Sequence, residues 1–277
     1  MLGDFDVRTA LAAPGQTTVE VVRVPELEAG FHLLYELKFE EARNQFEAWQ
    51  KSHPADPLAS ASRRAICLRC AIGGVLSSEF FLDDKRFIGK IPLKPDPKLR
   101  AAFFAAVKRA RDLAQCRLKT SPDDTNALFA MALSLGMQAD YASLIDKQQF
   151  DRLKMIRDAD KYAKKLLMIT PDAADAYLGM GTANCVAGSL PRYKQFLLGR
   201  LWNPWRQECR HPAARDRGHY LRPFAKILLA LVALREKKTE VARAQLKELV
   251  KEFPENPPFP SELAKIKAPA VDIPPRS

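Results

Sequence analysis

The stretch GFHLLYELKFEEARNQFEAWQKSHP, residues 30–54, predicts two helices joined by a short turn. Phe39, Ala42 and Phe46 recur at three- and four-residue steps, so they share one face of the second helix. Pro54 ends that helix because proline has no amide hydrogen to donate. The small side chain of Ala42 lets a neighbouring helix approach closely. The stretch therefore predicts a helical hairpin that packs against further helices.

The same punctuation recurs along the chain. An alanine is followed twelve residues later by a proline at Ala42/Pro54, Ala110/Pro122, Ala159/Pro171 and Ala242/Pro254. Each proline follows a helical, charge-rich segment and precedes an acidic or Asn-containing turn. The first two prolines are 68 residues apart, which is two periods of 34, and the later spacings of 49 and 83 residues indicate insertions.

This pattern resembles the tetratricopeptide repeat, whose unit of about 34 residues is a helix–turn–helix hairpin. In the best copy, the family's characteristic residues are matched by Gly30, Leu33, Phe39, Ala42, Phe46 and Pro54. The resemblance implies an all-α fold: a right-handed superhelix of antiparallel helical hairpins with irregular insertions. A non-repetitive helical bundle with proline stops is the alternative.

The domain organisation follows from where this pattern begins and ends. Residues 1–24 are interpreted as an extended leader, and residues 25–256 as the helical repeat domain. Irregular insertions are expected near 57–97 and 188–221. Residues 257–277 are rich in proline and are interpreted as a partly disordered tail.

Two stretches, residues 58–75 and 200–217, lose the repeat periodicity and hold three of the five cysteines. We interpret them as insertions or as diverged or frame-shifted segments. Cys67 and Cys70 form a CxxC pair, which elsewhere binds zinc or cycles electrons. The sequence has no second CxxC, and Cys209 is far away in the chain, so incidental small residues are the favoured reading. No metal and no cofactor are predicted.

Composition indicates a globular, water-soluble protein. Of the 277 residues, 47% are hydrophobic and 28% charged, and no apolar run approaches the 18–20 residues needed to span a bilayer. The net charge of +11 favours an acidic partner or reflects a solvated basic surface. The N-terminus lacks a basic region followed by a sustained apolar run, so a cytoplasmic location is expected, or export if an upstream start supplies a signal peptide.

The motifs argue against catalysis. The chain contains no GxSxG, no Gly-rich phosphate loop and no HExxH, so no catalytic residues are predicted and the protein is not expected to be an enzyme. The leading hypothesis is a scaffold whose concave groove binds another protein or peptide. His32, Tyr35, Asn126 and Phe129 are the expected contact residues, although the same side chains could instead pack between repeats.

The alternative is an adaptor for nucleic acid or an anionic surface through the basic-aromatic stretch Arg192–Arg222. Its candidate contacts are Arg192, Lys194, Arg200, Trp202, Trp205 and Arg206. Phosphate contacts combined with base stacking suit single-stranded nucleic acid, and a basic amphipathic element suits a membrane surface. A plain linker between repeats remains the simplest reading. The identity of the partner and the oligomeric state are left open.

Overall fold

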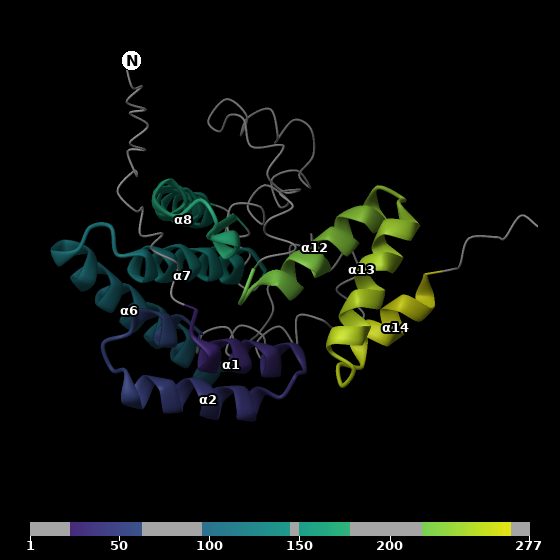
Figure 1. Cartoon of the computed structure of the whole chain (residues 1–277), viewed down its shortest axis with the longest axis horizontal. Coiled ribbons are helices and arrows are strands. Elements are labelled where there is room, and N and C mark those ends of the chain that lie inside the picture. The colour runs from purple at the N-terminus through teal and green to yellow at the C-terminus, as the bar shows by residue number, and fades with distance from the viewer. Residues whose placement is uncertain (1–22, 63–95, 145–149, 178–217, 267–277) are drawn as a thin grey trace, which may run out of the picture.

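The computed structural model describes residues 23–62, 96–144, 150–177 and 218–266. Every regular element in these ranges is a helix, which confirms the predicted all-α class (Figure 1). The helices are α1 (Pro25–Tyr35), α2 (Phe39–Ser52), α6 (Pro97–Thr120), α7 (Thr125–Leu144), α8 (Phe150–Ile169), α12 (Arg222–Arg235), α13 (Thr239–Glu252) and α14 (Pro258–Lys265). None of the described helices is long and apolar enough to cross a membrane.

The helices pack as three groups (Figure 1). The hairpin of α1 and α2 lies along one edge, α6, α7 and α8 pack in succession on one side of it, and α12, α13 and α14 pack on the other side. Helix α7 is central to its group, because residues 127–135 are all buried. Its apolar residues on all sides fit a helix surrounded by protein rather than one that faces water.

Two hairpin turns have the same backbone geometry. Leu37, between α1 and α2, has a φ of 63°, and Lys237, between α12 and α13, has a φ of 58°. The next residue donates its amide to a carbonyl in the first helix of the hairpin. Lys38 N donates to Leu33 O at 2.9 Å, and Lys238 N donates to Ala233 O at 2.8 Å. These pairs are 200 residues apart in the sequence, so the chain builds one turn twice.

The four helices that contain the alanines of the alanine–proline pairs also end in the same way. The residue before the proline donates its amide to the carbonyl four residues earlier, from His53, Ser121, Thr170 and Phe253, at 2.7–2.8 Å. The paired alanines, Ala42, Ala110, Ala159 and Ala242, are all buried. The four pairs therefore share their local structure, whereas a tetratricopeptide-like superhelix remains a prediction.

Close packing inside the first hairpin depends on Gly30. A Cβ atom added to Gly30 would lie 2.7 Å from both Cδ1 and Cζ of Phe46, which is closer than carbon atoms can approach without displacement. Phe46 is fully buried and also meets the ring of Phe31 edge-on, with the ring centroids 5.5 Å apart. The aromatic ring of Phe46 thus takes the space that a side chain at position 30 would need.

The first hairpin packs against the last. The Glu255 amide donates to the Glu36 carboxylate at 3.0 Å, and the Asn256 side-chain amide donates to the Tyr35 carbonyl at 2.6 Å. The ring of Tyr35 lies 5.4 Å from that of Phe253. In an open array each hairpin contacts only its neighbours. This contact joins residues about 220 positions apart, so the first and last hairpins are neighbours in space.

Both predicted boundaries of the helical domain shift outward. Val24, assigned from the sequence to the leader, is buried and lies in the same apolar cluster as Phe31. Helix α14 lies within the predicted tail, and its Phe259 is fully buried against α13. Both segments carry apolar side chains that the neighbouring helices cover, so residues 24 and 258–266 belong to the packed structure.

Candidate partner-binding site

The four predicted contact residues divide into two surface positions and two core positions. His32 is exposed, with its ring 4.9 Å from that of Phe253, and Asn126 is half-buried. Tyr35 is only 1% exposed and Phe129 only 2%. In this structure other parts of the same chain cover both aromatic side chains, as in the alternative that they pack within the fold, and their role as partner contacts stays a prediction.

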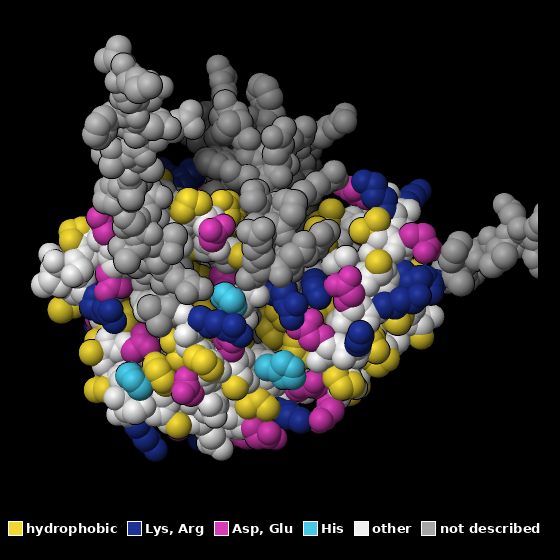
Figure 2. All heavy atoms as spheres, viewed as in Figure 1, with side chains coloured by type: hydrophobic (Ala, Val, Ile, Leu, Met, Phe, Trp, Pro, Cys, Tyr) yellow, Lys and Arg dark blue, Asp and Glu magenta, His cyan; other side chains and the backbone are white. Residues whose placement is uncertain are grey.

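The basic-aromatic candidates lie outside the described residues, as do Cys67, Cys70 and Cys209. Of that stretch, residues 218–222 are described, and the guanidinium of Arg222 pairs with Glu252 on α13. Figure 2 shows Lys and Arg side chains (dark blue) interspersed with Asp and Glu side chains (magenta) over α12–α14, on the right of the view. On this face, the positive charges of the described helices are balanced locally and do not form a patch of one sign.

The ring of Tyr220 stacks beside that of Phe129. Its ring lies 5.3 Å from that of Phe31 on α1 and 6.0 Å from that of Phe129 on α7. Its hydroxyl oxygen accepts a hydrogen bond of 3.0 Å from the backbone amide of Val24. Burial raises the pKa of the Tyr220 hydroxyl above its usual range, so this group stays protonated. Two helices distant in sequence thus hold one inserted aromatic residue.

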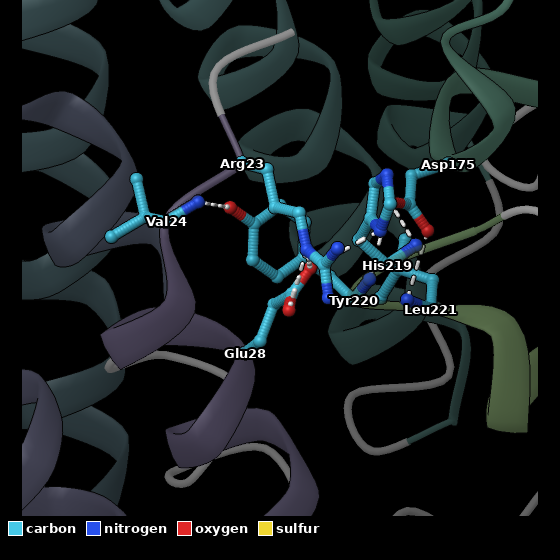
Figure 3. A network of polar contacts seen from close by, with 7 residues as sticks. All are labelled: Arg23, Val24, Glu28, Asp175, His219, Tyr220 and Leu221. Carbon is cyan, nitrogen blue, oxygen red and sulfur yellow. Dashed lines mark hydrogen bonds and ion pairs between the residues drawn. The ribbon is translucent and has the colours of Figure 1, made fainter.

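Asp175 holds the backbone on either side of Tyr220. Its carboxylate accepts hydrogen bonds from the amides of His219 at 2.9 Å, Tyr220 at 3.2 Å and Leu221 at 2.9 Å (Figure 3). These amides precede α12, where backbone donors lack helical acceptors, and a carboxylate is a strong acceptor for them. Burial raises the pKa of Asp175, and the three hydrogen bonds oppose that rise.

An ion-pair group lies at the edge of this site. Glu28 accepts hydrogen bonds of 2.8 and 2.9 Å from Arg23, and its carboxylate lies 3.1 Å from Nδ1 of His219 (Figure 3). Arg23 is mostly exposed, whereas the Glu28 side chain is largely covered. We call Val24, Phe31, Phe129 and Asp175, together with the residues 219–221 that they hold, the Tyr220 site.

A pocket of about 280 Å³ opens beside the Tyr220 site, between the start of α1, the end of α2 and the start of α7. Trp49 and His53 stack along it with ring centroids 3.7 Å apart, and Trp49 donates to Asp56 at 2.6 Å. Asn126 also lines the pocket, and its Oδ1 atom is buried without a hydrogen-bond partner among the described residues. The predicted contact residue Asn126 therefore lines the pocket, although its Oδ1 atom is covered by the surrounding protein.

The described residues also bear on whether the fold holds a metal site or a cysteine pair. They contain no group of three or more His, Cys, Asp or Glu side chains placed to hold a metal ion. Cys116 is a free, exposed thiol. The arrangement offers aromatic contacts, a carboxylate for backbone amides and an amide acceptor, which are groups that bind polypeptide.

Comparison with family models, with curated proteins and with solved structures gives no match. The site is interpreted from its own geometry.

The sequence singled out Asn126 and Phe129, and its basic-aromatic stretch Arg192–Arg222 includes Tyr220, but it did not single out Val24 or Asp175. One available signal points to Asp175: it comes four residues after Pro171, and Asn126 comes four residues after Pro122. Equivalent positions after the closing proline are expected to lie on equivalent faces of successive helices. Tyr220 lies in the basic-aromatic stretch, outside the repeat pattern, so its aromatic character was noted but its place between α1 and α7 was not predicted.

Proposed function

We propose that this protein is a non-enzymatic, tetratricopeptide-like helical scaffold that binds another protein through the face formed by α1, α7 and the helix that starts near Asp175. The observation that carries this proposal is the shared local structure of the four alanine–proline pairs, each with a buried alanine and the same terminal hydrogen bond. Stacked hairpins of this kind present the faces of their first helices as a common binding surface.

The chemistry of this face supports polypeptide as the ligand class. Phe31 and Phe129 surround an aromatic side chain, and Asp175 accepts backbone amides. Pockets for alternate side chains combined with main-chain hydrogen bonds are how folded domains bind extended peptides. The neighbouring pocket adds the side chain of Asn126 and the stacked rings of half-buried Trp49 and exposed His53.

Site-specific crosslinking tests the proposal. A photo-crosslinking residue placed at His32 or at Asn126 should capture one discrete protein from a host lysate, at low and at high salt and after nuclease treatment. The same residue placed at Lys161 on α8 or at Val241 on α13, which are exposed positions outside the site, serves as the matched control and should not capture it.

Two outcomes would contradict the proposal. Equal capture from all four positions would mean that the face has no special role. Capture that disappears with salt or nuclease would favour the alternative, an adaptor for nucleic acid or an anionic surface.

A further inference from the structure

Residues 219–221 lie on the proposed binding face in the way a bound peptide would. They are held by α1 through Val24 and Phe31, by α7 through Phe129, and by Asp175 from a third helical segment. Helices from three successive parts of the chain therefore converge on a three-residue segment that comes more than 40 positions after the last of them.

We propose that residues 219–221 occupy the peptide-binding position of this face in cis, and that the partner binds as an extended segment containing a tyrosine that displaces Tyr220. This inference rests on the proposed function and names the ligand class of the same face. The contacts in the Tyr220 site are the template for that ligand.

The contacts are of two kinds: hydrogen bonds to the peptide backbone, and contacts with one side chain. Among the described residues, the hydrogen bonds that the Asp175 carboxylate accepts come from backbone amides, so they do not depend on the side chains of the segment. Specificity comes from the ring between Phe31 and Phe129 and from the hydroxyl that accepts the Val24 amide. A phenylalanine would fill the ring space but leave that buried amide without an acceptor, so tyrosine is preferred.

Departure of the segment would cost α12 the hydrogen bond of 3.0 Å from the Ala225 amide to the Leu221 carbonyl but would leave the apolar contacts between α12 and α13 in place. Tyr220 belongs to the apolar cluster of α1, α6 and α7, together with Phe31 and Phe129. Helices α12 and α13 build a second cluster around Ile227, Leu246 and Leu249, which Tyr35 at the end of α1 also joins. Pro223, in the first turn of α12, has no amide that requires a partner. The segment therefore connects two packed units whose apolar clusters differ.

Hydrogen exchange on the full-length protein is the first test. The amides of His219, Tyr220 and Leu221 should exchange by local opening, about 100-fold faster than the buried amides of α7. A tyrosine-containing peptide should change this exchange because it competes for the same position. Exchange of the three amides only together with global unfolding would overturn the inference, since the segment would then be a fixed part of the core.

A peptide-binding assay is the second test. The probe is a fluorescent synthetic peptide of residues 218–224, GHYLRPF, added to the full-length Tyr220→Ala variant. Without the competing cis side chain, that variant should bind the probe about tenfold more tightly than the wild-type protein does. Replacing the probe tyrosine by phenylalanine should weaken binding about tenfold, and replacing it by alanine should abolish binding.

The matched control is Asp175→Ala in the Tyr220→Ala background, which should lose the probe although the aromatic pocket is intact. A Tyr220→Ala variant that folds but ignores the probe would overturn the inference, and so would a variant that does not fold, because Tyr220 would then be an obligatory core residue. Neither result would affect capture of a partner from His32 or Asn126. Loss of that capture alone would instead contradict the proposed function.

Discussion

The hairpin of α1 and α2 and the hairpin of α12 and α13 are built alike but are used differently. Both turns place a residue at positive φ, and both form the same backbone hydrogen bonds, with partners that differ by 200 in residue number. Yet Glu36, in the first turn, is only 7% exposed, and its counterpart Glu236 is exposed. The first turn is docked against the rest of the chain, and the last faces water.

A few side chains account for this difference. Phe253, Glu255 and Asn256, at the end of α13, receive the first turn through ring contacts and hydrogen bonds. The corresponding residues at the end of α2 are His53, Ala55 and Asp56, and His53 is exposed. Asp56 has no side-chain N–H to donate, and its carboxylate already accepts from Trp49 and from the Leu58 amide. The fold of each hairpin is therefore determined by its own residues. The docking of the first hairpin is determined by Phe253, Glu255 and Asn256, just after α13.

The largest effect is expected at Phe253. Phe253→Ala should destabilise the protein by about 3–5 kcal/mol, because a fully buried ring is removed from beneath Tyr35 and His32. The matched substitution His53→Ala should cost about 0.5 kcal/mol, because that ring is exposed. Urea unfolding of both variants measures the difference, and similar costs would mean that the two hairpin ends are equivalent.

The next effect concerns how closely the two helices of a hairpin approach. Gly30 and Phe46 correspond to Ala230 and Leu246 in the last hairpin, so a larger residue on one helix is matched by a smaller one on the other. Gly30→Ala should destabilise the protein by about 1–3 kcal/mol through overpacking against Phe46.

The double variant Gly30→Ala/Phe46→Leu, which copies the last hairpin, should recover part of that loss, and denaturant midpoints of single and double variants test this. The control Ala230→Gly should cost about 0.5–1 kcal/mol, the ordinary penalty for glycine within a helix. A fully tolerated Gly30→Ala would show that the helices of the first hairpin are further apart than the structure has them.

A smaller effect is expected at the two positive-φ residues. Lys237→Gly should stabilise the protein by about 0.5–1 kcal/mol, because glycine adopts this conformation without a steric penalty and the Lys237 side chain is exposed. Leu37→Gly should gain less, since Leu37 is half-buried and its apolar contacts are lost. Thermal unfolding midpoints compare the two, and an equal gain would mean that docking does not involve the Leu37 side chain.

The smallest effect is expected from the ion pair that joins the docked turn to its receptor. The Lys38 ammonium lies 2.7 Å from the Glu255 carboxylate, and this contact raises the pKa of Lys38 above its usual 10.5. Its stabilising contribution should therefore persist up to pH 10.5 and be lost as the pH rises through the higher folded-state value.

Lys38→Ala should lower the thermal midpoint slightly at low salt and not at 1 M salt, because both side chains are partly exposed. The matched variant Lys238→Ala, which breaks only the local pair with Glu236, should have no effect at either salt concentration. A salt-sensitive loss in both variants would remove the distinction between the docked and the free turn.

The sequence predicted what depends on neighbouring residues and missed what depends on distant ones. The spacing of Ala42 and Pro54 fixes a helix face and a helix end, so the first hairpin and the other helices with this spacing could be predicted. The docking of Tyr35 onto Asn256 and the insertion of Tyr220 join residues about 90–220 positions apart, and no periodicity connects them. Aromatic side chains such as Phe129 suit a partner surface and an internal one equally well, which is why the sequence left both alternatives open.

The contact between the first and last hairpins also has a consequence for biosynthesis. The apolar face of α1 is completed only when Tyr220 and Phe253 have been translated. At about 5–20 residues per second, the ribosome needs about 10–40 s to add the intervening residues. During that interval the nascent chain exposes Phe31 and Tyr35, so chaperone occupancy on stalled nascent chains should fall only after the end of α13 has emerged.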